Sequence, residues 1–240
     1  MKKATTLILA LFIVGVTNAQ WRKVKGNGNV VTIERSTGDY DYVSVSGFFD
    51  VDLVDGDEGE ITLKGEENLL DHIVTEVKGD KLVIKVEKGK NLQPSNWKDG
   101  IKITVPVESI NGVSLSGSGD IVGKKKLKAD EFKTSMSGSG DITLEVEANS
   151  LTTSMSGSGD ISLSGSTGDF DVSISGSGDI KAYDLEAENV EAQVSGSADI
   201  RVTCNGVLRA RVSGSGDIHY RGNPTKIDTK TSGSGDISRG

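Results

Sequence analysis

The residues of this chain most capable of chemistry are seven aspartates that recur at nearly equal spacing. Each belongs to the phrase Ser-Gly-Ser-Gly-Asp-Ile, in which Ala198 once replaces a glycine. The steps between successive copies are 21, 19, 19, 20, 18 and 19 residues. We call these residues the aspartate row: Asp120, Asp141, Asp160, Asp179, Asp199, Asp217 and Asp236. A carboxylate can accept hydrogen bonds, bind a hard cation or transfer a proton.

Stacked repeats would turn the aspartate row into a line of like charges. Unit charges ~4.8 Å apart repel by roughly 1 kcal/mol in water, and by about 3.5 kcal/mol at an effective dielectric of 20. The repulsion is offset if each carboxylate accepts hydrogen bonds from nearby backbone N–H groups and serine hydroxyls. The alternative offset is a row of weakly bound calcium ions, because calcium prefers hard oxygen ligands. The sequence favours the first interpretation and leaves the second open, with all seven aspartates as candidate ligands.

Catalysis is the least favoured chemistry. His72 and His219 are the only histidines and lie in different regions of the chain. No spaced set of histidines and cysteines exists, and no serine stands out as a nucleophile. The glycine-rich phrase is followed by no lysine and no helix, so it is not a phosphate-binding loop. A glycan-active β-helix enzyme would need a cluster of acidic, basic and aromatic residues that breaks the repeat, and we find none. The sequence therefore predicts a protein that is not an enzyme and that has no cofactor other than the calcium considered above.

The elements between the phrases are short strands. In one repeat Ile142, Leu144 and Val146 alternate with polar residues, and Leu151 begins a second alternating run after a polar turn. Period-2 alternation is typical of half-buried strands. A unit of about 19 residues cannot bury a core alone, so units must stack on one another. The sequence predicts an all-β parallel β-solenoid, with a right-handed β-helix as the expected hand.

The phrase itself fits a corner of the coil. If Met136, Gly138, Gly140 and Ile142 face inward, the two serines and the aspartate of the phrase point outward. Glycine leaves room for a sharp bend because it lacks a side chain. Every corner therefore presents serine and aspartate to solvent, and we call this surface the serine–aspartate face.

Residues 20–111 are β-rich but irregular. We predict strands over 43–54, 60–64, 81–87 and 100–107, a hairpin turn at Lys78–Asp80 and a short helix over 68–73. Residues 45–51 follow the corner pattern with Phe48 and Phe49 in place of small residues, and Phe49 could fill the blunt end of the solenoid. We predict a lead segment over 20–41 and one domain over 42–237. That domain has degenerate rungs over 42–111 and the phrase repeats over 112–237.

The chain begins with an expected export signal over residues 1–19. Lys2 and Lys3 precede an apolar stretch, and Ala19 ends a plausible cleavage site. Removing the signal leaves 25 basic and 35 acidic residues, a net charge of −10. Such an acidic protein repels nucleic acid. The apolar stretch is short for a membrane span, so we expect no transmembrane span and an exported protein that is periplasmic, on the cell surface or secreted.

Cys204 lies in phase with Ile200 and is expected in the core.

Two further groups of residues raise surface hypotheses. Lys124–Lys126 and Lys128 form the one basic run, expected as a solvated turn, with contact to an anionic glycan or lipid as the alternative. Trp97, Tyr183 and Tyr220 could offer stacking surfaces for sugars, although aromatic residues make up only 5% of the chain.

The repeated SGSGDI corners, which follow an N-terminal stretch containing FFDVDL and HIVTEVKGDKLVIKVEK, carry a family resemblance. The chain resembles the family called putative auto-transporter adhesin, head GIN domain, over most of its length after residue 42. The resemblance implies a β-solenoid in a Gram-negative cell envelope, a role in adhesion and no assigned catalytic residues.

These patterns lead to one functional hypothesis and one chief alternative. The first is an adhesin-type binding module that presents the serine–aspartate face to a glycan or a surface protein through many weak contacts. The alternative is a structural or assembly module that self-associates through the solenoid ends.

Overall fold

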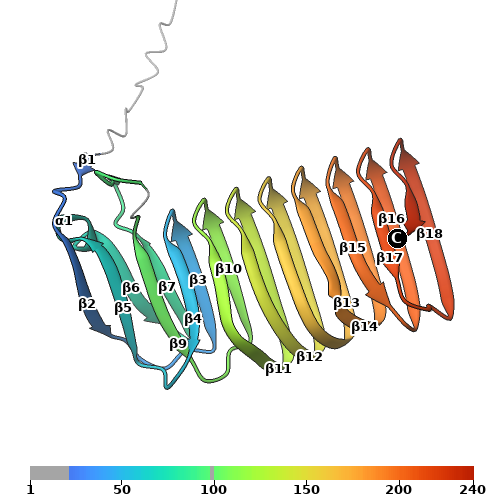
Figure 1. Cartoon of the computed structure of the whole chain (residues 1–240), viewed down its shortest axis with the longest axis horizontal. Helices are drawn as coiled ribbons and strands as arrows, with labels where there is room; N and C mark the ends of the chain where they lie inside the picture. Colours follow the sequence, from blue (N-terminus) through green and yellow to red (C-terminus); the bar gives the residue numbers. More distant parts are fainter. Residues whose placement is uncertain (1–21, 98–99) are drawn as a thin grey trace, which may run out of the picture.

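The protein is a rod of stacked β-coils (Figure 1). The computed structural model describes residues 22–97 and 100–240. The expected export signal at 1–19 lies outside them. The coils form a parallel β-solenoid of about 7 turns with ~19 residues per coil, which confirms the predicted fold class.

The phrase repeats build the regular part of the rod. Its strands are β10 (Gly112–Gly117), β11 (Ile121–Gly138), β12 (Ile142–Gly157), β13 (Ile161–Gly176), β14 (Asp179–Gly196), β15 (Asp199–Cys204), β16 (Val207–Gly214), β17 (Ile218–Arg221), β18 (Lys226–Gly233) and β19 (Ile237–Arg239). Successive coils pair in parallel and in phase, so that Ser137 lies beside Ser156 and Gly138 beside Gly157. Equivalent residues therefore form straight columns along the rod.

The core runs along the axis of the rod and is filled by the alternating apolar residues. Ile142, Leu144 and Val146 are each at most 2% exposed. Cys204 is fully buried with its thiol free, which confirms its predicted place in the core. Burial raises the pKa of this thiol.

The corners depend on glycine for two different reasons. Gly138 has a φ of +146°, a conformation that residues with a side chain rarely adopt. A Cβ on Gly140 would lie 1.9 Å from the carbonyl oxygen of Gly119 in the preceding coil. At this corner the phrase therefore brings one coil too close to the next for a side chain at the second glycine, whereas the corner of Ala198 accommodates a methyl group.

The N-terminal part continues the rod with a more varied topology. Its elements are β1 (Arg22–Lys25), β2 (Val30–Ser36), β3 (Tyr42–Gly47), β4 (Asp50–Asp55), β5 (Glu60–Glu66), α1 (Glu67–Leu70), β6 (Ile73–Lys78), β7 (Lys81–Val86), β8 (Lys90–Gln93) and β9 (Lys102–Val107). β3 and β4 pair in parallel with β10 and β11, so they form one complete corner rung. The predicted strand over 43–54 is therefore two strands joined at a corner.

The N-terminal part also contains antiparallel strand pairs. β2 pairs with β5, and β6 pairs with β7 across the predicted turn, where Gly79 has a φ of +66°. The predicted helix is confirmed but ends at Leu70, because Ile73 already pairs with Val86 in the β6–β7 hairpin. β1 and β8 form a separate two-stranded parallel sheet.

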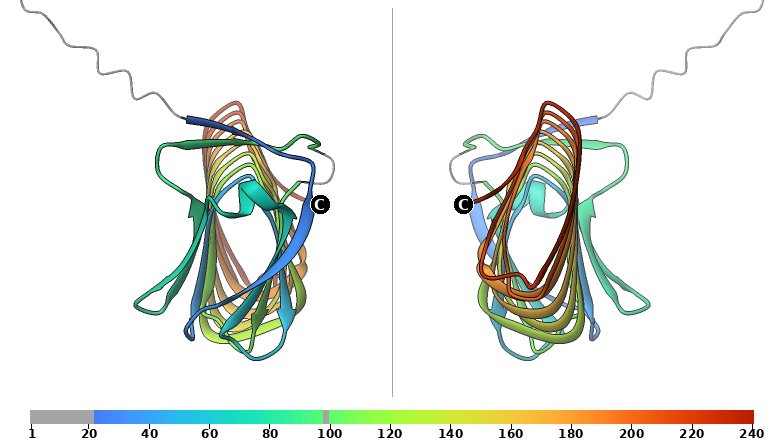
Figure 2. Two further views of the ribbon diagram at one scale, coloured as in Figure 1. Left: turned by 90° about the vertical axis from the view of Figure 1, so that its left-hand side faces the viewer. Right: turned by 90° about the vertical axis from the view of Figure 1, so that its right-hand side faces the viewer.

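The N-terminal end of the core is covered. Viewed along the axis, α1 lies across this end of the rod (Figure 2). Its Leu69 and Leu70 are at most 1% exposed, and Phe49 is fully buried in the first corner. Phe49 thus fills the first corner, and α1 covers the end of the rod that Phe49 was expected to fill.

The lysine run is not a turn, which corrects the expectation from the sequence. It lies in β11, where the register with β12 shifts between Val122 and Lys126. The added residues are taken up by this bulge. Within the described residues, five ion pairs join the run to neighbouring coils: Lys124 with Asp52, Lys125 with Asp55, Lys126 with Glu145 and Glu147, and Lys128 with Glu147.

Candidate functional site: the aspartate row

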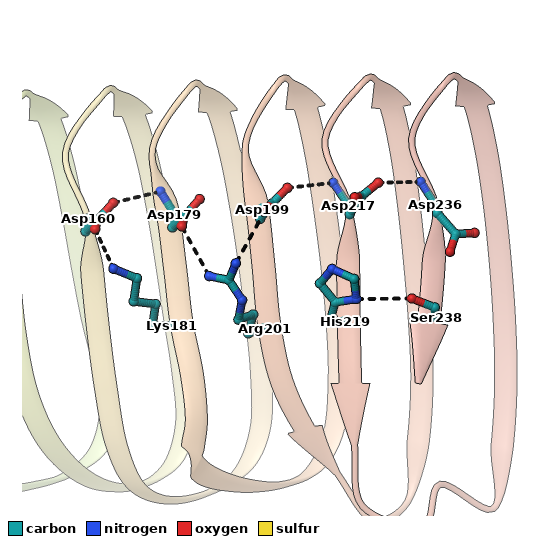
Figure 3. A network of polar contacts seen from close by, with 9 residues as sticks. All are labelled: Asp160, Asp179, Lys181, Asp199, Arg201, Asp217, His219, Asp236 and Ser238. Atoms are coloured by element: carbon teal, nitrogen blue, oxygen red, sulfur yellow. Dashed lines mark hydrogen bonds and ion pairs between the residues drawn. The ribbon is translucent and has the colours of Figure 1, made fainter. Parts of the chain in front are cut away.

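The corners place the aspartate row on one line along the rod, and the side chains bond to one another's backbone (Figure 3). In each bond, Oδ1 of one aspartate accepts the backbone N–H of the aspartate in the next coil. The distances are 2.9 Å from Asp120 to Asp141, 2.9 Å from Asp141 to Asp160, 3.1 Å from Asp160 to Asp179, 3.0 Å from Asp199 to Asp217 and 2.7 Å from Asp217 to Asp236.

The bonds arise because the corner interrupts the strand ladder. The N–H of Ile142 donates to the carbonyl oxygen of Asp160 at 2.9 Å, and the ladder continues from there. At the aspartate position itself, one residue before the isoleucine, the N–H of Asp160 donates to Oδ1 of Asp141 and not to a backbone carbonyl. A partly buried N–H without an acceptor is unfavourable, so this side chain completes the ladder. The hydrogen-bonding interpretation of the row is confirmed for the N–H groups; serine hydroxyls make no such bond within the described residues.

One step of the row differs. Asp179 and Asp199 pair as members of the β14–β15 ladder, whereas the earlier ladders β11–β12, β12–β13 and β13–β14 begin at the following isoleucine. Ala198, which replaces glycine and is fully buried, directly precedes Asp199. The extra methyl group and the changed pairing thus occur at the same corner.

The structure adds Asp50 to the row, which the sequence analysis had not counted. Its Oδ1 lies 3.4 Å from the N–H of Asp120. Burial raises the pKa of Asp50, and the charges of Asp120 and Asp52 raise it further. The signal was available, since residues 45–51 follow the corner pattern, but the phenylalanines hid it.

Two cations neutralise the middle of the row. Lys181 Nζ lies 2.6 Å from Oδ2 of Asp160, and Arg201 lies 3.1 Å from Asp179 and 3.5 Å from Asp199. Both cations occupy the same column, two positions after the aspartate of their own coil. Burial acts to raise the pKa of Asp160, but Lys181 and the Asp179 N–H outweigh it, so this pKa lies below its usual value.

His219 occupies the next place in that column. Its Nδ1 lies 3.1 Å from Oγ of Ser238, in the following coil. The His219 ring is therefore partly buried and has a polar partner. His72 lies elsewhere, paired with Glu87 at 2.7 Å.

The arrangement suits a fixed polar surface better than a reaction centre. Oδ1 accepts an N–H group in five of the seven row members, while the side chains of Asp160, Asp179 and Asp199 remain 31–36% exposed. Across residues 22–97 and 100–240, no group of three or more His, Cys, Asp or Glu side chains is placed to hold a metal ion. Calcium binding by the row stays a prediction.

A family model described as "Putative auto-transporter adhesin, head GIN domain" matches residues 39–224. The chain belongs to this family. The match includes six of the seven phrase copies and all of β3 to β17, so the resemblance carried by the corners is confirmed. Among curated proteins, none matches the chain.

Solved structures share the head GIN fold. A putative adhesin from Bacteroides fragilis is 25% identical, with a TM-score of 0.82 over 90% of this chain and 99% of its own. A protein from Parabacteroides distasonis, described as a putative lipid binding protein, is 29% identical, with a TM-score of 0.73 over 91% of this chain and all of its own. A putative adhesin from Parabacteroides merdae, 22% identical, shares the fold with a TM-score of 0.70 over 91% of this chain and 99% of its own.

The head GIN family suggests an exported or cell-surface protein. The four-residue α1 is far too short to cross a bilayer, and the described part of the chain holds no other candidate for a membrane-spanning helix.

Proposed function

We propose that this protein is a non-catalytic binding module of the Gram-negative cell envelope that holds a glycan or a surface protein on its serine–aspartate face. One observation carries the proposal: the carboxylates of successive corners are fixed by backbone N–H groups, with outward serines beside them. Such a surface repeats the same polar groups in every coil. Many weak contacts at a fixed spacing add up to strong attachment.

The family and its neighbours support a role in adhesion. The family model is described as a putative auto-transporter adhesin, and the solved relative from Bacteroides fragilis, which shares the fold, is described as a putative adhesin. The proposal places the chain outside the cytoplasm, in the periplasm, on the surface or in the medium, after removal of residues 1–19. It expects no turnover of polysaccharide.

Binding to immobilised glycans and envelope extracts tests the proposal. The test variant replaces the exposed corner serines with alanine, which leaves the corner backbone bonds in place: Ser139, Ser158, Ser177 and Ser215. The matched control replaces four hydroxyl residues away from the corners and from the column of Lys181 and Arg201: Ser150, Thr152, Ser164 and Ser166. We expect the corner variant to lose at least tenfold in affinity and the control to bind like the wild type. Equal binding by both would overturn the proposal.

One observation favours self-association as a second function. Every residue of β18 is exposed, including Ile227 at 48%. An exposed strand offers unpaired N–H and C=O groups to another chain. Sedimentation from about 1 to 100 μM would show a rise in mass that Ile227→Lys abolishes; a constant monomer mass would exclude this function.

A further inference from the structure

A hollow of about 540 Å³ lies at the N-terminal end of the serine–aspartate face. Its lining includes the aromatic residues Phe48 and Trp97, the apolar Val86 and Leu92, and the polar residues Ser46, Lys90, Asn91 and Ser116. Trp97 is 65% exposed, more than the two other large hydrophobic residues exposed in the described chain, Val30 and Ile227. A volume of this size is within the range of small-ligand sites, about 300–1,000 Å³.

The aromatic residues of the hollow pack on the first corner of the rod. Phe48 occupies the corner position that Ser118 holds in the next coil, since Val51 pairs with Ile121. Its ring lies 5.2 Å from that of the fully buried Phe49 and 5.4 Å from the Trp97 indole, with the latter pair tilted by 59°. Aromatic pairs prefer such tilted packing. A single corner of the rod thus carries an aromatic surface where the others carry serine.

A buried carboxylate holds the segment that carries Trp97. Glu66 is 5% exposed and accepts bonds from the N–H of Ser95 at 2.7 Å, from its hydroxyl at 2.8 Å and from the N–H of Gly28 at 3.0 Å. Burial acts to raise the pKa of Glu66, but these bonds and one from the Asn96 N–H outweigh it and lower the pKa. The two residues before Trp97 are therefore bound to a buried carboxylate, and the indole itself contacts the ring of Phe48.

From this arrangement we infer that the Phe48–Trp97 hollow binds a neutral pyranose oligosaccharide. The apolar C–H face of a sugar ring can pack on an exposed indole. The hydroxyl groups of the sugar then need hydrogen-bond donors and acceptors among the polar lining residues. Asn91 and the two serines supply both, and Lys90 supplies a donor. Lys90 Nζ lies 4.0 Å from Glu87, so the nearby charge is balanced and an anionic sugar is not required.

A lipid bilayer is the competing occupant, and the surface fits it less well. Membrane-binding surfaces combine a broad apolar area with basic residues. Here the apolar lining, Trp97 with Phe48, Val86 and Leu92, is confined to one hollow with polar residues in it, and neither Val30 nor Ile227 extends it. The site goes beyond the proposed function, because it needs none of the corner serines replaced in the test above.

Tryptophan emission tests the inference directly. Trp21 and Trp97 are the only tryptophans, so the variant Trp21→Phe reports on Trp97 alone. The probes are cellotetraose, chitotetraose and galactotetraose. We expect at least one to change the emission with saturation in the micromolar to millimolar range. Calorimetry with that sugar should show at least a tenfold loss for Trp97→Ala, a smaller loss for Trp97→Phe and no change for the exposed-residue control Ile227→Ala.

Two variants test how the site is held. Ser95→Ala removes one bond to Glu66, and Glu66→Gln removes the charge; both should weaken sugar binding while Trp97 itself is retained. The corner-serine variant should bind the sugar normally, which separates this site from the proposed function.

Absence of any response to the three sugars would overturn the inference, as would unaltered binding by Trp97→Ala. Binding of phosphatidylcholine vesicles that depends on Trp97, without any sugar response, would instead assign the hollow to a membrane.

Discussion

Asp160 and Asp179, one coil apart, are joined through a single oxygen: Oδ1 of Asp160 accepts the backbone N–H of Asp179 at 3.1 Å. The other oxygen, Oδ2, lies 2.6 Å from Lys181. One carboxylate therefore closes a gap in the strand ladder and binds a cation. These two roles can be separated by substitution, because asparagine keeps the acceptor and loses the charge.

We expect Asp160→Ala to destabilise the protein more than Asp160→Asn. Alanine leaves the Asp179 N–H without its acceptor, at a cost of about 1 kcal/mol at this partly exposed corner. Asparagine retains the acceptor and loses an exposed ion pair, worth below about 1 kcal/mol. Urea unfolding measures both. Asp141 is the matched control, since its Oδ1 accepts an N–H at 2.9 Å and no salt bridge to it is found in the described residues. There alanine should still cost stability and asparagine almost none; equal effects of alanine and asparagine at both positions would contradict this.

The stability effects of Asp50 and Asp160 should depend on pH with opposite signs. The folded-state pKa of Asp50 is raised by burial and by Asp120, so its stabilising contribution is present below the unfolded pKa, about 3.9, and is lost as pH rises through the folded value. Asp50→Asn should therefore raise the urea midpoint at neutral pH, and the gain should fade in acid.

At Asp160 the folded-state pKa is lowered, with Lys181 outweighing burial. Its contribution is present above about pH 3.9 and is lost as pH falls through the folded value. Asp160→Asn should lower the urea midpoint at neutral pH, and the loss should fade in acid. Urea midpoints of both variants at about pH 7 and about pH 3 decide the matter. Shifts of the same sign at neutral pH would show that the row acts as one uniform line of charge.

The fold was predictable where the sequence repeats and less so where it does not. Ile142 and Leu144 reveal their strand by alternation alone, and the phrase marks each corner. For β3 the signal is weaker: residues 45–51 follow the corner pattern, but the spacing does not show that β3 pairs with β10, where Ser114 donates to Ser44 at 3.0 Å across 70 positions. Only the packing of the intervening β5 to β9 brings these strands together.

The site divides in the same way. The period placed all seven aspartates on one line, but Lys181 and Arg201 each occur once, and a residue that does not repeat gives no periodic signal. Trp97 could be noticed as an aromatic residue that might stack on sugars, whereas its contact with Phe48 at 5.4 Å depends on the long-range fold.

Replacement of a corner glycine should be far more disruptive than its small size suggests. A Cβ at Gly140 would lie 1.9 Å from the Gly119 carbonyl oxygen, so the coils must separate. We expect Gly140→Ala to cost at least about 2 kcal/mol in urea unfolding. Gly38→Ala is the control, because nothing lies within 4 Å of its added methyl group. A neutral Gly140→Ala would mean that the other corners adapt as the Ala198 corner does.

Calcium should have little effect on the melting temperature of the protein. Oδ1 of five row members, Asp120, Asp141, Asp160, Asp199 and Asp217, already accepts an N–H group. Lys181 and Arg201 occupy Oδ2 of Asp160, Asp179 and Asp199. A site with a Kd above 5 mM would add below about 0.4 kcal/mol at 5 mM calcium, a shift of roughly 1–2 °C. Thermal melts after exhaustive chelation, with and without 5 mM calcium, measure this. A rise of several degrees that is lost in Asp120→Asn/Asp141→Asn, where no cation pairs with the row in the described residues, would instead establish the row as a calcium site.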